Sequence, residues 1–259
     1  MSNLISGYLW GYKNYKAGVK SIETFKKFYP QSDVFVKIDT DGDLENYTQG
    51  LIPYNVDISL QSSKIGYPGK FAPSGHDAER DYWPFKNLYT WLKSIYDSCK
   101  KTESKYMIIL EEDVFLLKPI SIIEKNFGVA IVKNKNQFPY RIVKFIQDLK
   151  GNTNTIGYGA CGGAIINTEV FIKGFDIAIP YLEKEFNDIA TYTHLVGWSD
   201  MMLQVIIMCG GGEVIVNEQL VEPWMVEQGW IDKDWKEFEI VNYLKDHTLI
   251  NYSINNGYR

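Results

Sequence analysis

The stretch that decides the fold is Tyr106–Leu116, which reads YMIILEEDVFL. Its apolar part is too short for a membrane helix and is typical of a strand buried on both faces of a parallel sheet. Side chains alternate along a strand, so the odd-numbered residues from 107 to 113 are expected on one face. The even-numbered residues, Glu112 included, are expected on the other face.

Two carboxylates, those of Glu111 and Asp113, thus share one face at the carboxyl end of this strand. In open α/β sheets, ligands bind at this edge. Repulsion between two such charges at short range costs about 1 kcal/mol in water and several times more near a protein interior. A cation removes that cost, so we expect Glu111 and Asp113 to hold a divalent metal that carries a phosphorylated substrate. A solvated acidic turn is the alternative that the local pattern leaves open.

The segments before this strand alternate between strand and helix patterns. Leu4–Trp10 is a plausible first strand, and Tyr12–Phe28 has apolar residues at helical spacing. Asp33–Asp39 is a second strand that again ends in an acid, and a short third strand is expected around Val56–Ile58. Pro84 then sits early in a helix that runs to about Cys99. This β-α-β beginning predicts an α/β fold with a mostly parallel central sheet flanked by helices.

The second half of the chain is less regular. Expected there are a strand at 127–132, a short helix at 140–149, a glycine-rich loop that leads into a strand near 162–167, a partial helix at 171–186, a helix at 198–209 and a strand at 213–217. Ser199 is a reasonable N-cap for the helix that ends at Cys209, with Asp200 in its first turn. We find no repeats and no clear linker, so a single domain over residues 1–259 is expected.

Composition excludes several function classes. The net charge is -5 and no basic stripe is present, so no nucleic-acid partner is expected. The three cysteines are widely spaced, which suggests neither a disulfide framework nor a zinc motif. No stretch reaches the roughly 18 apolar residues of a transmembrane segment, and the N-terminus lacks a signal-peptide pattern. We expect a cytoplasmic protein, or one that acts in a host cytoplasm.

Two strings bear on phosphate binding. Residues 157–162 read GYGACG and match a dinucleotide fingerprint, but a polar loop precedes them and a β-branched run follows, which is the wrong context. Glycine instead lets backbone approach another group closely, although a simple flexible loop is also compatible. The sequence contains no P-loop string, so a bound phosphate ester would need a metal to neutralise it. Oxygen ligands suit magnesium or manganese.

Histidine and aspartate offer two further candidates. His247 is the best histidine for a third metal ligand, and imidazole is accepted by manganese more readily than by magnesium. Asp200 follows a Gly-Trp-Ser turn at a helix start and is a candidate general base. A simple helix N-terminal charge, worth under about 1 kcal/mol, is the structural alternative for Asp200.

Taken together, these features resemble nucleotide-sugar-dependent glycosyltransferases of the GT-A fold, small members of which are encoded by large DNA viruses and by bacteria. The resemblance covers about residues 4–250. Three motifs carry it: the Asp-x-Asp-like triplet Glu111–Asp113, the glycine pair Gly162 and Gly163, and the turn Gly197–Asp200. Two of them depart from the family pattern, with Glu at the first position of the triplet and Ser199 in place of the acid before Asp200.

The resemblance implies roles for individual residues. Asp113 is expected on the metal with Glu111 as the secondary ligand, and His247 corresponds loosely to a C-terminal metal histidine. Glu112 belongs to the same nucleotide-binding motif but is the residue least expected to touch the ion. The remaining donor-binding candidates that the resemblance implies are Asp39, Arg80, Lys86, Gly162 and Gly163.

The implied reaction moves a sugar from a nucleotide diphosphate sugar, most simply a UDP-sugar, to a hydroxyl of a glycan or glycoconjugate acceptor. Mn²⁺ or Mg²⁺ would stabilise the leaving diphosphate, and Asp200 would act as the base of an inverting displacement. About residues 1–118 would bind the nucleotide sugar, and about residues 119–259 the acceptor. A nucleotidyltransferase of similar fold and a non-catalytic carbohydrate-binding protein are the two alternatives.

Overall fold

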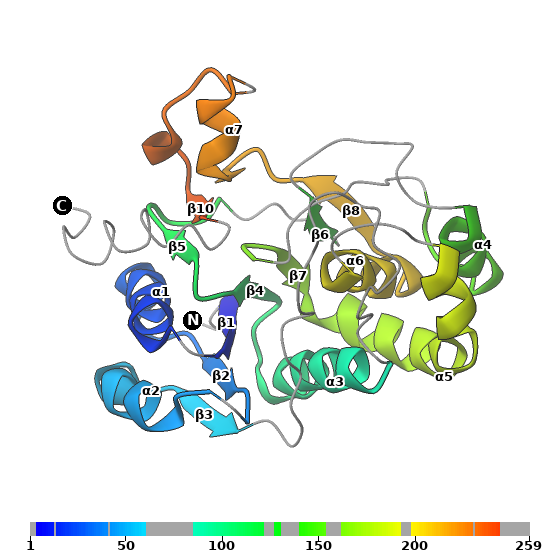
Figure 1. Ribbon diagram of the computed structural model, residues 1–259, viewed down its shortest axis with the longest axis horizontal. Coiled ribbons are helices and arrows are strands. Elements are labelled where there is room, and N and C mark those ends of the chain that lie inside the picture. The colour runs from blue at the N-terminus through cyan, green and yellow to red at the C-terminus, as the bar shows by residue number, and fades with distance from the viewer. Residues whose placement is uncertain are drawn as a thin grey trace.

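A five-stranded sheet forms the centre of the protein in the computed structural model, which describes residues 4–12, 14–40, 42–60, 85–121, 127–130, 140–153, 162–192, 198–229 and 231–243 (Figure 1). Its strand order is β3-β2-β1-β4-β7. The strands are β1 (Ile5–Gly11), β2 (Val34–Ile38), β3 (Asp57–Leu60), β4 (Tyr106–Leu110) and β7 (Ile165–Asn167).

The strand directions place a switch in topology between β1 and β4. β1 pairs in parallel with both β2 and β4, β2 pairs in parallel with β3, and only β7 is antiparallel to its neighbour β4. From β1 the chain builds the sheet outward through β2 and β3, and it then returns to add β4 on the other side of β1. Ligands of open α/β sheets bind at such a switch point, at the carboxyl ends of the strands.

Helices cover both faces of the sheet, as Figure 1 shows. On one face lie α1 (Tyr15–Phe28) and α2 (Leu44–Leu51), which contact each other. On the other lies α3 (Phe85–Lys101), which packs on α5 (Thr168–Tyr192), and α5 in turn contacts α6 (Trp198–Cys209). The mostly parallel α/β architecture predicted from the sequence is therefore confirmed.

The remaining elements are short. Two small sheets contain β5 (Val114–Leu116), β10 (Ile240–Asn242) and β9 (Leu220–Val221), and β6 (Phe127–Ala130) with β8 (Glu213–Val216). The other helical segments are η1 (Ile52–Tyr54), α4 (Tyr140–Asp148), α7 (Pro223–Glu227) and η2 (Trp235–Glu237). Among the residues described, no helix has both the length and the apolar character needed to cross a membrane.

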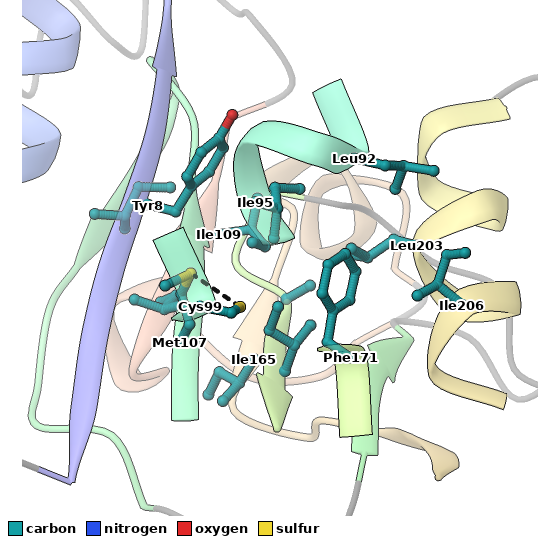
Figure 2. Close-up of a cluster of buried hydrophobic side chains, with 14 of the residues drawn as sticks. Tyr8, Leu92, Ile95, Cys99, Met107, Ile109, Ile165, Phe171, Leu203 and Ile206 are labelled. Atoms are coloured by element: carbon teal, nitrogen blue, oxygen red, sulfur yellow. Dashed lines mark hydrogen bonds between the residues drawn. The ribbon is translucent and has the colours of Figure 1, made fainter. Parts of the chain in front are cut away.

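β4 is buried along its whole length, and its side chains alternate as expected. Met107 faces α3, where its Sδ lies 3.9 Å from Cys99 Sγ (Figure 2). Leu110 faces α1, because a Cβ added to Gly7 would lie 3.3 Å from the Leu110 side chain and 3.4 Å from that of Phe25. Burying an apolar side chain of this size contributes about 1.5–3 kcal/mol, so the strand holds both helical layers against the sheet.

Three expectations need correction. The stretch Tyr106–Leu116 is not one strand, because β4 ends at Leu110 and β5 joins β10 in a different sheet. The β-turn between them is closed by Val114 N donating to Glu111 O at 3.2 Å, and it leaves Glu111 and Glu112 partly buried and Asp113 buried. Helix α2, at Leu44–Leu51, was not predicted at all.

The third correction concerns α5, which is helical over all 25 residues rather than in part. Pro180 lies inside it, and an interior proline costs about 3 kcal/mol or more. The buried side chains recur every three or four residues and supply the opposing packing energy; they are Phe171, Phe175, Ala178 and Leu182.

Candidate functional site

The carboxyl ends of β1, β2 and β4 meet at one edge of the sheet and bring acidic residues together there. β1 ends at Gly11, β2 is followed directly by Asp39, and β4 is followed by the turn Glu111–Asp113. Because these strands are parallel neighbours, their ends lie side by side at the switch point. The acidic turn therefore lies beside the end of β1.

Asp39 is fixed against the end of β1 by its own main chain. Its N–H donates to Gly11 O at 3.0 Å, and its carbonyl accepts from Gly42 N at 2.7 Å. The residue is fully buried, and one carboxylate oxygen, Oδ1, accepts a hydrogen bond from Thr40 Oγ1 at 3.3 Å. Asp39 is therefore a rigid part of the switch-point edge.

Asp113 and Glu111 differ in exposure. Asp113 is 1% exposed, and its carbonyl accepts from Tyr243 N at 2.9 Å, which anchors the end of the acidic turn to the chain after β10. Glu111 is only partly buried. Its carboxyl carbon would lie 3.3 Å from a Cβ added to Gly162, so Glu111 reaches toward the glycine pair.

Gly162 and Gly163 are required by the close approach of three segments. A Cβ at Gly162 would lie 2.8 Å from both Asn242 Nδ2 and Val114 Cγ2, which is closer than real Cβ atoms come. Gly163 has a φ of 86°, a left-handed conformation that favours glycine, and its N–H donates to Ile109 O at 2.8 Å. The glycine pair is thereby held against the acidic turn. This agrees with the prediction that glycine is needed here because the backbone comes close to another group.

Glu112 points away from Glu111, toward α1 and α2. Its Oε1 accepts hydrogen bonds from Tyr12 N at 2.7 Å, from Asn14 N at 3.2 Å and from Tyr47 Oη at 2.5 Å. Burial first, and then the adjacent Glu112 carboxylate, raise the pKa of Tyr47 well above its ordinary value. The tyrosine is therefore a neutral hydrogen-bond donor at physiological pH.

The contacts of the described residues do not test the remaining predicted site residues. Lys86 is exposed at the second position of α3, and Asp200 is the third residue of α6, where the side chain is outside the part described. Arg80 and His247 both lie outside the described residues. Their predicted roles in donor binding, in metal binding and, for Asp200, as the general base stay predictions.

Two residues at this edge were missed by the sequence reading. Asn242 is 2% exposed, pairs across the strands with Val114, and donates through Nδ2 to Gly162 O at 3.2 Å. Tyr47 lies on the unpredicted helix α2. The sequence feature associated with Tyr47 is the pair Gly11 and Gly18. A Cβ at either position would lie within 3 Å of the Tyr47 ring or hydroxyl, so both positions must be glycine for the ring to fit.

The oxygen ligands at the acidic turn suit a hard divalent cation. Within the part of the chain that the structure describes, no group of three or more His, Cys, Asp or Glu side chains is placed to hold a metal. Magnesium is commonly bound by one or two carboxylates, with substrate phosphate and water completing its shell. The pair Glu111 and Asp113, at an edge where ligands bind, fits that requirement.

Solved structures with a similar fold include glycosyltransferases. The galactosyltransferase LgtC, in complex with donor and acceptor sugar analogues, gives a TM-score of 0.51 at 14% identity, covering 93% of this chain and 87% of LgtC. The glycosyltransferase GlyE of Streptococcus pneumoniae, in its apo form, gives 0.51 at 10% identity, covering 93% of this chain and 55% of GlyE. No protein-family model and no curated protein matches the sequence. The GT-A fold inferred from the resemblance is confirmed.

The buried Tyr47 predicts how stability depends on alkaline pH. As pH rises past about 10, tyrosine ionises in the unfolded chain but not at this site, because its folded pKa is higher. The stability that Tyr47 contributes is therefore complete below about pH 10 and is lost above it. We expect Tyr47→Phe to lower the free energy of unfolding by about 1.5–3 kcal/mol at pH 7, as for a hydrogen bond to a charged group.

Urea denaturation between pH 7 and pH 11 measures this effect. The difference between wild type and Tyr47→Phe should shrink as pH rises above about 10. Tyr181→Phe removes a hydroxyl from a residue that is 49% exposed and serves as the control. Parallel stability curves for wild type and Tyr47→Phe across this range would contradict the assignment.

Proposed function

We propose that the protein is a metal-dependent glycosyltransferase that moves a sugar from a nucleotide diphosphate sugar to a hydroxyl acceptor. The observation that carries the proposal is the position of the turn Glu111–Asp113 at the switch point between β1 and β4, with Glu111 beside Gly162. The fold shared with LgtC and GlyE agrees with this chemistry. We infer a UDP-sugar as the donor and a glycan or glycoconjugate as the acceptor.

Charge balance supports the metal. A diphosphate brings negative charge to an edge that already carries Asp39, Glu111 and Asp113, and the sequence contains no P-loop to neutralise it. Asp113, with Glu111 as the secondary ligand and His247 as the third, would hold Mn²⁺ or Mg²⁺. When bound, the cation supplies Lewis-acid stabilisation of the leaving diphosphate.

The protein's own residues provide the rest of the reaction. The glycine pair, Gly162 and Gly163, lets backbone approach the donor closely, while Asp39 contacts the nucleoside and Arg80 or Lys86 meets the diphosphate or ribose. The acceptor oxygen bonds to the anomeric carbon as the bond from that carbon to the diphosphate oxygen breaks. Asp200 takes the proton of the attacking hydroxyl, and attack on the face opposite the departing diphosphate inverts the anomeric carbon. About residues 1–118 bind the donor and about residues 119–259 the acceptor.

Replacing Asp113 tests the metal assignment. Asp113→Asn keeps the size of a side chain that is 1% exposed but removes its charge. We expect sugar transfer or donor hydrolysis to fall at least about 100-fold, because a metal Lewis acid supplies several kcal/mol. The assay is release of UDP from UDP-sugars during a MnCl₂ titration.

Asp176→Asn, at an exposed position of α5, is the matched control and should behave as wild type. Unchanged transfer by Asp113→Asn would rule out Asp113 as the metal ligand. A wild-type protein that binds sugar nucleotides but never turns them over would instead be a carbohydrate-binding protein on this scaffold.

Asp200→Asn tests the general base. Positioned bases typically contribute 10²–10⁴-fold, so we expect kcat to fall by about that factor while the KM for the donor changes little. Initial rates at saturating donor and acceptor measure it. A loss of less than about tenfold would show that another group accepts the proton, and a retained anomeric configuration in the product would remove the inverting mechanism.

A further inference from the structure

Glu112 spans the switch point. Its main chain belongs to the acidic turn after β4, whereas its Oε1 is bonded to groups that come from the chain after β1 and from α2. In sequence, Tyr12 and Asn14 lie 100 and 98 residues away from Glu112. This one oxygen therefore ties together the two sides of the junction where a ligand of this fold binds.

The carboxylate also supplies a charge that α1 lacks. The first turn of α1 contains no acidic residue, and its N-cap Asn14 uses its side chain to accept from Ala17 N. The N-terminal end of a helix carries a partial positive charge that favours a nearby anion. Glu112 provides that anion from the turn after β4, at the N–H groups of Tyr12 and of the N-cap itself.

Tyr47 fixes the same oxygen from the side of α2. The ring is fully buried, and a Cβ at Gly18 would lie 2.2 Å from its hydroxyl. A Cβ at Gly11 would lie 2.7 Å from Cζ of the same ring. The absence of both Cβ atoms lets the hydroxyl reach Glu112, so β1, α1 and α2 converge on one carboxylate oxygen.

This arrangement separates Glu112 from its two neighbours in the triplet. The Oε1 atom faces three donors on the α1 side, while Glu111 reaches toward Gly162. A phosphate at the N-terminus of α1, the position used in dinucleotide-binding folds, would also be repelled by the carboxylate that already lies there. The proposed cation on Asp113 and Glu111 would remove this repulsion on the opposite side of the turn, so the phosphates of a donor would be favoured there.

We propose that Glu112 is a positioning residue for the nucleotide: it holds Tyr12 and Asn14 against the acidic turn and so sets the width of the donor site. The proposal rests on the proposed function and adds that the three acidic residues of the triplet have different roles. Glu112 acts on nucleotide affinity through the chain after β1, while Asp113 and Glu111 act on the metal.

Calorimetric titration of the whole protein measures the two affinities separately. One series titrates MnCl₂ alone, and the other titrates UDP, with GDP, ADP and CDP in parallel, at saturating MnCl₂. Glu112→Gln keeps an acceptor oxygen but loses the charge, and we expect it to weaken binding of the preferred nucleotide about tenfold, since charge-assisted hydrogen bonds are roughly twice as strong as neutral ones. Glu112→Ala leaves all three donors without this acceptor and should weaken it at least about 30-fold.

Two further variants sharpen the test. Gly18→Ala leaves Glu112 in place but adds a Cβ in the space of the Tyr47 hydroxyl, and it should weaken nucleotide binding in the same direction. Glu45→Gln removes one negative charge from an exposed position in the first turn of α2 and should bind nucleotide as wild type does. In the transfer assay, the Glu112 variants should raise the KM for the donor with little change in kcat.

The outcomes are distinct. Weaker nucleotide binding with unchanged Mn²⁺ affinity supports the proposal, and Glu112→Gln keeps the test valid if Glu112→Ala does not fold. If Glu112→Gln and Glu112→Ala both bind nucleotide as tightly as wild type, the proposal for Glu112 is wrong and the proposed function still stands. The same holds if the variants lose Mn²⁺ affinity and nucleotide affinity equally, because Glu112 would then be a structural residue or a metal ligand. If wild type binds none of the four nucleotides with MnCl₂, the proposed function fails, and this inference fails with it.

Discussion

Burial of β4 on both faces is the constraint on which the rest of the structure depends. Its five residues lie between β1 and β7 in the sheet and between the α1 and α3 layers, and all five are buried. Burying an unpaired carboxylate in that position would destabilise the folded state by far more free energy than burying an apolar side chain contributes. The chain therefore turns at Glu111, where the acidic residues reach the sheet edge, and enters a second sheet through β5.

The turn also determines what can gather around it. Because β5 pairs with β10, Asn242 lies opposite Val114 and reaches the Gly162 carbonyl, and Tyr243 donates its N–H to Asp113 O. Because β4 lies next to β1, Glu112 reaches the N–H groups that precede α1. One acidic turn is thus held by the segments after β1 and β10 and against the glycine pair before β7. Such support keeps a binding site in a fixed geometry.

Local sequence predicted the parts of this structure that local physics controls. The buried strand up to Leu110, the amphipathic helices α1 and α3, and the apolar helix at Trp198–Cys209 follow from periodicity. The expected N-cap was wrong, because Ser199 is the second residue of that helix. The break between β4 and β5 could not be predicted, because the residues before and after the triplet are equally apolar. Their sequence pattern does not tell whether they belong to the same sheet. Glu112 and Tyr47 are 65 residues apart, and no spacing rule connects them. Gly11 and Gly18 made sense only once the Tyr47 ring was seen beside them.

The central claim is that a divalent cation and the diphosphate of a nucleotide sugar meet at the Glu111–Asp113 turn. Anomalous diffraction from a crystal grown with MnCl₂ and UDP tests it most directly, because the scattering locates manganese without reference to activity. We expect one strong manganese peak bonded to an Asp113 carboxylate oxygen and to UDP phosphate oxygens, with Glu112 still bonded to Tyr12 and Tyr47. Manganese and UDP bound elsewhere, or UDP bound at this edge with no manganese beside Asp113, would contradict it.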